Sequence, residues 1–228
     1  MCGRFSLTAD VQTLAGRFSL DGPIPAPQRR YNIAPGAPIL GIASNEGQRR
    51  ADLFQWGLIP PYEQNKPNPK RLVNVRIETL LERPAFLPLR QCRVLVPADA
   101  FFEWKKDGNR KFPYKIGLKE NALFGLAAVS WPALDKNQRP TLTVAILTTE
   151  ANGLVAQLHT RMPVILPLEE EKAWLGPEPF PEALYERLRR PFPEDALIAY
   201  PVSLRVNAPY SESPGLLEPI GEPLFPHT

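Results

Sequence analysis

Prolines make up 28 of the 228 residues and are dispersed along the whole chain, which limits the folds open to it. A proline fixes its own backbone angle, lacks an amide donor and breaks a helix interior, so dispersed prolines favour short strands joined by rigid loops. This distribution argues against a helical bundle. The hydrophobic content of 43% is enough for one substantial core. We expect a single domain over residues 1–228, with the last few residues loose.

Short apolar and β-branched runs recur between turn residues, and they predict strands. The predicted strands are 38–44, 52–58, 92–98, 112–118, 123–131, 141–149, 163–166 and 197–206. Fewer segments carry a helical pattern, with Thr8 as the N-cap of the first. The predicted helices are 8–18, 76–86, 150–159, 168–175 and 180–190. We therefore predict an α+β fold, with a mixed, barrel-like β core of short strands and peripheral helices.

The sequence lacks the signals that mark several classes of protein. No segment approaches the roughly 18 consecutive apolar residues of a membrane helix, and the N-terminus has no signal-peptide pattern, so we expect a cytoplasmic protein without a membrane partner. The two cysteines, Cys2 and Cys92, have neither disulfide-framework nor zinc-ligand spacing. Glycine-rich phosphate loops and hydrolase motifs are absent, so we expect no metal and no cofactor. The net charge of +3 permits an anionic partner without requiring one.

The first residues, MCGR, offer an unusual nucleophile. Removal of Met1 would leave Cys2 with a free α-amine beside its thiol. An α-amine has a pKa of about 7.7 to 8.0, so it is nucleophilic at neutral pH without the burial that a lysine needs. Such an aminothiol condenses with an aldehyde to an imine, which the thiol then closes into a thiazolidine ring. The position of Cys2 fits equally a small residue that begins the first strand.

Glu103 is the candidate general acid–base. It lies between Phe102 and Trp104 just after an apolar run, and a low-dielectric setting would raise its pKa as this role requires. The alternative is an outward-facing carboxylate paired with Lys105 or Lys106.

Two further segments carry candidate site residues. His159 suits proton shuttling, and its neighbour Arg161 suits a phosphate or carboxylate, although a histidine at a helix end is the alternative. Asn74 is a candidate hydrogen-bonding partner of the nucleophile, and Arg76, near a helix start, a phosphate ligand. Loop capping is the more frequent use of such an asparagine.

Basic and aromatic residues are interleaved along the chain, a pattern typical of proteins that bind single-stranded nucleic acid. Arginines would follow the phosphates while aromatic rings, Trp56 among them, stack on bases. Most aromatic residues of a domain this size lie in the core, which is the alternative. The interleaved groups are Arg4 with Phe5, Arg30 with Tyr31, Trp56, and Phe101 to Trp104.

Taken together, the segments resemble the SOS-response-associated peptidase (SRAP) family of abasic-site processing proteins, from Cys2 to about Pro219. The segments that carry this resemblance are MCGRF, YNIAPG, WGLIP, NVRIET, CRVLVPADAFFEW, TLTVAILTTEAN, HTRMPVIL and RVN. The family's usual pattern is altered at Ala100, Val75, Ile77 and Tyr62, which puts in doubt how the loop around Tyr62 stacks on a base.

The resemblance implies that Met1 is lost by self-processing and that Cys2 then cross-links to the aldehyde of an abasic site in single-stranded DNA. It implies catalytic roles for Cys2, Asn74, Glu103 and His159. It also implies phosphate contacts by Arg4, Arg76 and Arg161. We expect a monomer that associates with the nucleoid when bound to DNA.

Three alternative functions remain open at this point, one of which is a general protease acting on other proteins, as the family's name suggests. An N-terminal-nucleophile amidohydrolase would use the thiol of Cys2 on an amide, with its own amine as base. A non-covalent module for single-stranded DNA would use the arginines and aromatic rings without Cys2. A lyase side activity is a further expectation, because an imine acidifies the neighbouring carbon and a base such as Glu103 can then drive β-elimination.

Overall fold

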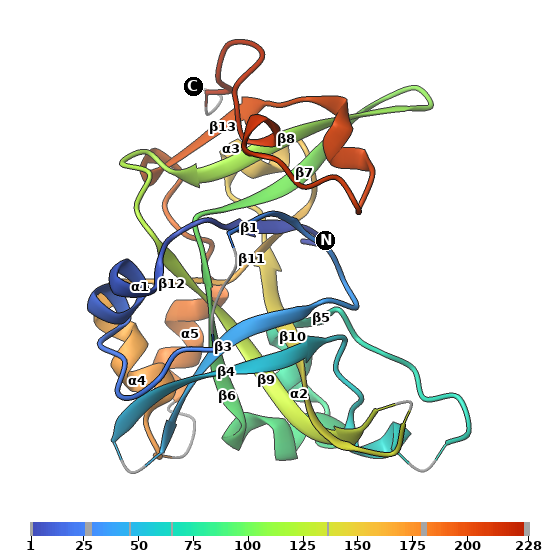
Figure 1. The fold of residues 1–228 in the computed structure, drawn as a ribbon, viewed down its shortest axis with the longest axis vertical. Helices are drawn as coiled ribbons and strands as arrows, with labels where there is room; N and C mark the ends of the chain where they lie inside the picture. The colour runs from blue at the N-terminus through green and yellow to red at the C-terminus, as the bar shows by residue number, and fades with distance from the viewer. Residues whose placement is uncertain are drawn as a thin grey trace.

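The structure, a computed structural model, describes residues 2–25, 29–45, 47–64, 66–135, 137–178 and 182–225. Two β-sheets form its framework (Figure 1). The strands are β1 (Phe5–Leu7), β2 (Arg30–Ile33), β3 (Pro38–Asn45), β4 (Gln48–Trp56), β5 (Asn74–Arg76), β6 (Arg93–Ala98), β7 (Ala100–Asp107), β8 (Arg110–Leu118), β9 (Phe124–Leu134), β10 (Pro140–Glu150), β11 (Arg161–Pro163), β12 (Ile165–Leu166) and β13 (Leu197–Pro201).

A closed barrel forms the centre of the molecule. Its strands pair in the circuit β10–β4–β3–β6–β9 and back to β10, with β10–β4 parallel and the other pairs antiparallel. Closure pairs the edges of these strands, and side chains fill the interior of a barrel this small. Every residue of β6 is buried, as expected of a strand covered on both faces. The short strands β5 and β11 attach to β10 near its C-terminal end.

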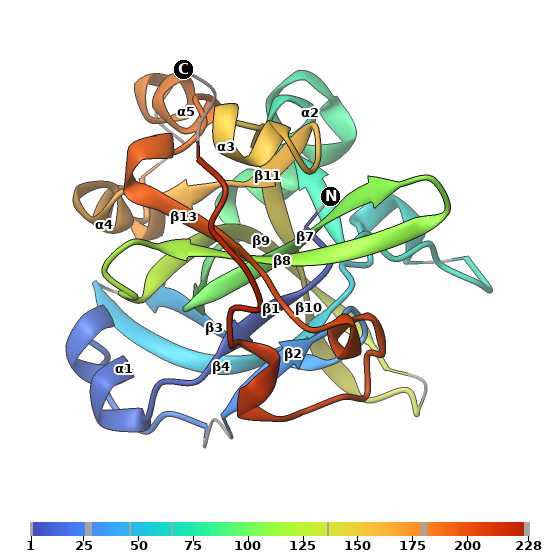
Figure 2. The same cartoon turned by 90° about the horizontal axis from the view of Figure 1, so that it is seen from above.

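The second sheet has the order β13–β8–β7–β1–β2 and is antiparallel throughout. It lies across one end of the barrel, with β1 between the barrel strands and the β7–β8 pair (Figures 1 and 2). The chain passes from the barrel into this sheet at Asp99, between β6 and β7. The Asp99 carboxylate accepts hydrogen bonds from the Thr8 amide at 2.5 Å and the Thr8 hydroxyl at 2.7 Å, which ties the crossover to β1.

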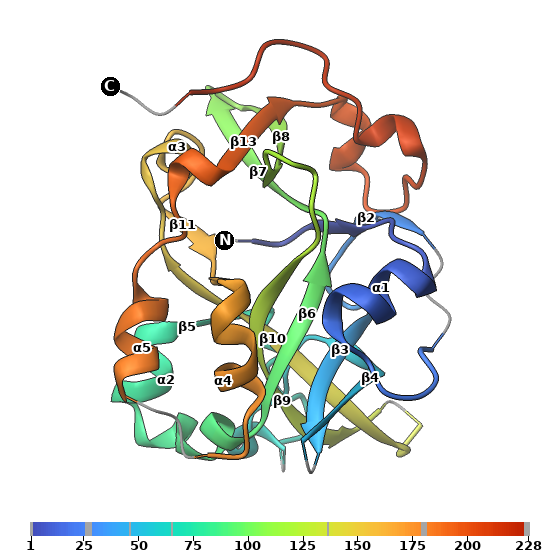
Figure 3. The same cartoon turned by 90° about the vertical axis from the view of Figure 1, so that its left-hand side faces the viewer.

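Short helices cover the flanks of the barrel, with α1 on one side and the neighbouring helices α2 and α5 on the other (Figure 3). The α-helices are α1 (Val11–Phe18), α2 (Ile77–Glu82), α3 (Gly153–Ala156), α4 (Glu171–Leu175) and α5 (Glu182–Arg189). Short 3-10 helices are η1 (Pro61–Glu63), η2 (Pro84–Gln91), η3 (Leu168–Glu170), η4 (Glu194–Ala196), η5 (Leu204–Asn207) and η6 (Pro214–Leu216). None of the described helices is long and apolar enough to cross a membrane.

The segment 202–225, which we call the C-terminal strap, folds back over the second sheet. It is held by isolated bridges between Val202 and Pro219 and between Ala199 and Leu224. Val202, Val206 and Leu216 of the strap form a small separate core with Phe102 of β7. The strap therefore supports the strand that carries Glu103. Residues 226–228, which we expected to be loose, lie outside the described residues.

The α+β fold with a barrel-like core is confirmed, but some predicted boundaries are wrong. Asp10, not Thr8, caps α1, because its carboxylate accepts from the Thr13 amide at 2.8 Å while Thr8 is engaged by Asp99. The strand predicted over 197–206 ends at Pro201. The helix predicted over 76–86 ends at Glu82, since the following prolines continue the chain as a 3-10 helix.

Candidate active site

Cys2 lies buried at the start of β1, between the two sheets. Its residue exposure is 0%, and its thiol donates to the Arg4 carbonyl at 3.9 Å. Pairing of β1 with β2 and β7 fixes this position, with Phe5 opposite both Ile33 and Phe101. Burial, followed by the nearby charge of Glu103, raises the pKa of the Cys2 thiol to about 12. The thiol is therefore protonated at neutral pH.

Asn74 connects the barrel to Cys2. It begins β5, which pairs in parallel with β10 so that Asn74 lies opposite Ile146. Its side-chain Nδ2 donates to the Cys2 carbonyl at 2.8 Å, a bond that spans 72 residues of sequence. Its Oδ1 is buried and has no hydrogen-bond partner among the described residues. The Asn74 side chain thus binds the Cys2 carbonyl through Nδ2, and its Oδ1 is available to accept a further hydrogen bond.

Glu103 lies in β7 opposite Tyr114, and only 3% of it is exposed. The alternative of a surface carboxylate is therefore wrong. Burial raises the pKa of Glu103 to about 7. A carboxyl group with this pKa can both give and take a proton at neutral pH, which is the property required of a general acid–base.

His159 follows α3 and precedes β11. Its Nδ1 lies 2.9 Å from the backbone N–H of Arg161. Because a backbone N–H can only donate, Nδ1 is the acceptor, and the proton of the neutral ring sits on Nε2. Burial lowers the pKa of His159. The ring is thus neutral at pH 7 and carries its proton on the nitrogen away from the backbone.

Arg76 and Arg161 differ in their surroundings. Arg161 makes a bidentate ion pair with Glu78 at 2.9 and 2.8 Å and also donates to the Thr148 carbonyl at 2.6 Å. Arg76 is exposed, and within the described part of the chain its side chain has no hydrogen bond or ion pair. Of the two cations beside Asn74, only Arg76 presents an uncompensated charge to solvent.

Arg4 lines a hollow of about 500 Å³ beside the start of β1, together with Gly3, Trp104, Asn109, Lys111 and Asn207. Its Nη1 donates to Asn32 Oδ1 at 2.8 Å and to the Val206 carbonyl at 2.7 Å. Trp104, one of the aromatic residues that the sequence grouped with the basic ones, lines this hollow and donates from Nε1 to Asn207 Oδ1 at 2.6 Å. An aromatic wall with two cations suits a nucleotide unit.

Trp56 is not part of the site, and its prediction as a base-stacking residue is wrong. It is 1% exposed, and its ring meets Phe5 edge to face with centroids 5.3 Å apart. Its Nε1 donates to the Val73 carbonyl at 3.0 Å. Both faces of the ring are covered by the core that joins β1 to the barrel, so no base can reach it.

Unsatisfied polar atoms mark the same region. Buried atoms without a hydrogen-bond partner in the described residues include Arg4 Nε, Asn74 Oδ1, Thr148 Oγ1 and Arg161 Nε. Native proteins pair nearly all such atoms, so their concentration in one place indicates a site that a ligand completes. Thr148 was missed at the sequence level, because a threonine within a β-branched strand carries no distinguishing signal.

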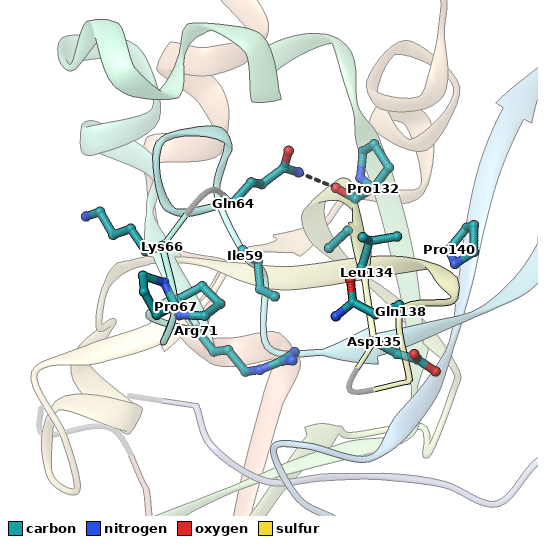
Figure 4. Close-up of a pocket in the computed structure, with 12 residues that line it drawn as sticks. Ile59, Gln64, Lys66, Pro67, Arg71, Pro132, Leu134, Asp135, Gln138 and Pro140 are labelled. Carbon is teal, nitrogen blue, oxygen red and sulfur yellow. Dashed lines mark hydrogen bonds between the residues drawn. The ribbon is translucent and has the colours of Figure 1, made fainter.

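A separate groove of about 590 Å³ runs between residues 59–71 and the β9–β10 hairpin (Figure 4). Pro132 and Leu134 face Lys66 and Arg71 across it, and none of the candidate catalytic residues lines it. Tyr62 lies in the same loop, and its ring contacts Phe86 edge to face instead. No group of three or more potential metal ligands occurs in the ranges that the structure describes.

Comparisons with known proteins cover nearly the whole chain. A family model described as SOS response associated peptidase (SRAP) matches residues 1–209. The abasic site processing protein YoqW of Bacillus subtilis is 38% identical over 224 residues, which cover 96% of this chain and 99% of that protein. The abasic site processing protein YedK of Escherichia coli is 30% identical over 184 residues, 78% of this chain and 81% of that protein. A crystal structure of a protein from Bacteroides thetaiotaomicron matches with a TM-score of 0.82 at 26% identity, covering 96% of this chain and 99% of that chain.

Proposed function

Because this chain belongs to the SOS response associated peptidase (SRAP) family, whose matched relatives include abasic site processing proteins, we propose that it processes abasic sites in DNA. More finely, it acts as a monomer on single-stranded DNA and cross-links Cys2 to the aldehyde of the lesion as a thiazolidine. The adduct shields the lesion from strand cleavage.

One observation carries this proposal: Asn74 holds the Cys2 carbonyl at 2.8 Å next to a buried glutamate whose pKa is raised to about 7. A buried carboxyl group and a hydrogen-bonding amide near the residue that becomes the N-terminus when Met1 is lost support this chemistry. Removal of Met1, which we assign to self-processing, creates the α-amine. The free Oδ1 of Asn74 then accepts a hydrogen from that amine and orients its lone pair.

The first chemical step is attack of the Cys2 amine on the aldehyde carbon of the open sugar. A C–N bond forms, the carbonyl oxygen becomes a hydroxyl, and Glu103 relays the proton from nitrogen. The hydroxyl then leaves as water with a proton from the Glu103 carboxyl group, while His159 donates a hydrogen bond to it from Nε2, and the N–H proton of the resulting iminium passes to the Glu103 carboxylate to give the imine. A neutral imidazole gives up a proton far less readily than a carboxyl group with a pKa of about 7, so His159 orients the leaving oxygen and Glu103 supplies the proton.

The second step closes the ring. The Cys2 sulfur adds to the imine carbon and its proton passes to nitrogen, so the only by-product of the whole condensation is one water. The raised pKa of the thiol keeps it from competing with the amine at the start. Ring closure also removes the imine, and with it the acidity that would permit β-elimination and strand cleavage.

The charges around Cys2 fit a DNA strand that passes over the site. Arg76 is exposed on one side, and Arg4 with Lys111 lines the hollow on the other. Arg161 contributes once a phosphate competes with Glu78 for its guanidinium. Phosphate contacts of this kind give affinity that falls with salt.

The test uses a labelled single-stranded oligonucleotide with one abasic site, incubated with the protein and resolved by denaturing electrophoresis. The expected result is a band shift that needs no reducing agent and is absent with an undamaged oligonucleotide. Cys92→Ser is the matched control, since Cys92 is the other cysteine of the chain and should cross-link normally. Cys2→Ser should lose the stable adduct.

Two results would refute the proposal. An adduct that survives Cys2→Ser but not Cys92→Ser would place the chemistry at the wrong cysteine. Turnover of small amides with no DNA adduct would favour the N-terminal-nucleophile amidohydrolase instead.

A further inference from the structure

Arg4 is a buried arginine that has no ion-pair partner among the described residues. It is 9% exposed, and both partners of its Nη1, Asn32 Oδ1 and the Val206 carbonyl, are neutral. Its Nε is buried and has no partner in the described residues. A guanidinium stays protonated in proteins, and burying a charge without an opposite charge is costly. The fold therefore holds a cation that it does not neutralise itself.

The hollow beside Arg4 has room for the missing anion. Its walls carry Lys111 as a second cation and no carboxylate. The Arg4 guanidinium carbon lies 5.7 Å from the centroid of the Trp104 ring, which confines it on that side. If the proposed function holds, the anion is a phosphate of single-stranded DNA.

Asn32 fixes the guanidinium in this place. It is fully buried in β2, and its Nδ2 is 3.0 Å from the Ala208 carbonyl, 3.1 Å from that of Ser211 and 3.3 Å from that of Val206. Three carbonyls accept only from a donor, so the amide nitrogen faces the C-terminal strap and the amide oxygen faces Arg4. One side chain thereby links β1 to the C-terminal strap.

We propose that Asn32 is a positioning residue for DNA binding, which holds Arg4 at the hollow as an uncompensated cation for a phosphate. This inference rests on the proposed function. An amide is required because it accepts from Arg4 without cancelling its charge. An aspartate has nearly the same shape, but it would neutralise Arg4 and turn a carboxylate oxygen toward the three strap carbonyls.

The experiment must separate this role from a merely structural one, in which Asn32 only fastens the strap. Salt dependence does so, because each phosphate neutralised on a single strand contributes about 0.7 to the slope of log K against log salt. The probe is a fluorescent, undamaged oligothymidylate, which has no aldehyde and binds without cross-linking. Anisotropy titrations at several NaCl concentrations give the slope for each variant.

We expect Asn32→Asp to lower the magnitude of the slope by about 0.7, as Arg4→Met does. Asn32→Ala should weaken binding while keeping the wild-type slope, because Arg4 remains charged but is no longer held. In the Arg4→Met background Asn32→Ala should have no further effect. Asn152→Asp is the control, a buried amide at the N-cap of α3 that should leave the slope unchanged.

A wild-type slope for a folded Asn32→Asp would overturn the inference while leaving the proposed function intact. If Asn32→Asp does not fold, as judged by thermal unfolding, the cycle of Asn32→Ala with Arg4→Met decides. If Asn32→Ala lowers the affinity for the oligonucleotide by the same factor in the wild-type and Arg4→Met backgrounds, a role of Asn32 through Arg4 is refuted. A wild-type protein that does not bind the oligonucleotide would instead contradict the proposed function, and the inference with it.

Discussion

Replacing Glu103 by glutamine tests the central feature of the site, a carboxyl group held in a buried position. The pKa of Glu103 is raised from 4.5 to about 7 by burial. Between these two values the folded state keeps a proton that the unfolded state has lost, so stability falls as pH rises through this window. At about 1.4 kcal/mol per pKa unit, the ionised carboxylate costs about 3 kcal/mol of unfolding free energy above pH 7.

Glutamine cannot ionise, so Glu103→Gln removes this penalty. We expect the stability of the variant relative to wild type to increase by about 3 kcal/mol between pH 4 and pH 8. Urea unfolding followed by tryptophan fluorescence at several pH values measures this difference, in which the contributions of groups that do not interact with Glu103 cancel. Glu120→Gln, at an exposed position after β8, is the matched control and should show no such trend. A difference that stays constant with pH would refute the burial argument.

Three further predictions concern catalysis, DNA binding and the core. Cys2→Ala, once Met1 is removed, should form an imine that borohydride traps and should cleave abasic strands, because no thiol closes the ring; gel electrophoresis measures both products. Arg76→Ala should lower the magnitude of the salt slope for single-stranded DNA by about 0.7, whereas Glu78→Gln should raise it by about as much, since Arg161 loses the carboxylate that pairs it. Trp56→Phe should cost about 1 to 3 kcal/mol in urea unfolding and leave the affinity for single-stranded DNA unchanged, because the ring lies in the core; a weakened affinity in the folded variant would restore its predicted role in base stacking.

The sequence was informative where local patterns decide the structure. Short, continuous apolar and β-branched runs located the barrel strands, because strands buried on both faces need continuous apolar residues. The aromatic neighbours of Glu103 correctly indicated a low-dielectric setting for its carboxyl group. The strands β1, β2 and β5 are too short for a periodic signal, and only their partners in the sheets define them.

Long-range contacts explain what the sequence could not predict. Arg161 is paired with Glu78 across 83 residues. No sequence pattern in either segment predicts that the first turn of α2, which carries Glu78, meets the start of β11, which carries Arg161. Asn32 joins Arg4 and the C-terminal strap across as many as 179 residues, so YNIAPG could be noticed as a motif but not given a role. Trp56 was predicted to stack on bases because basic and aromatic residues are interleaved along the chain, yet its ring lies in the core against Phe5.

Intact-mass spectrometry of the purified protein, alone and after incubation with an abasic single-stranded oligonucleotide, tests the account most directly. We predict that the protein alone lacks the mass of Met1. We predict that the adduct has the summed mass of protein and oligonucleotide less one water, without borohydride. A retained Met1, or an adduct that appears only after borohydride reduction, would contradict the thiazolidine chemistry assigned to Cys2.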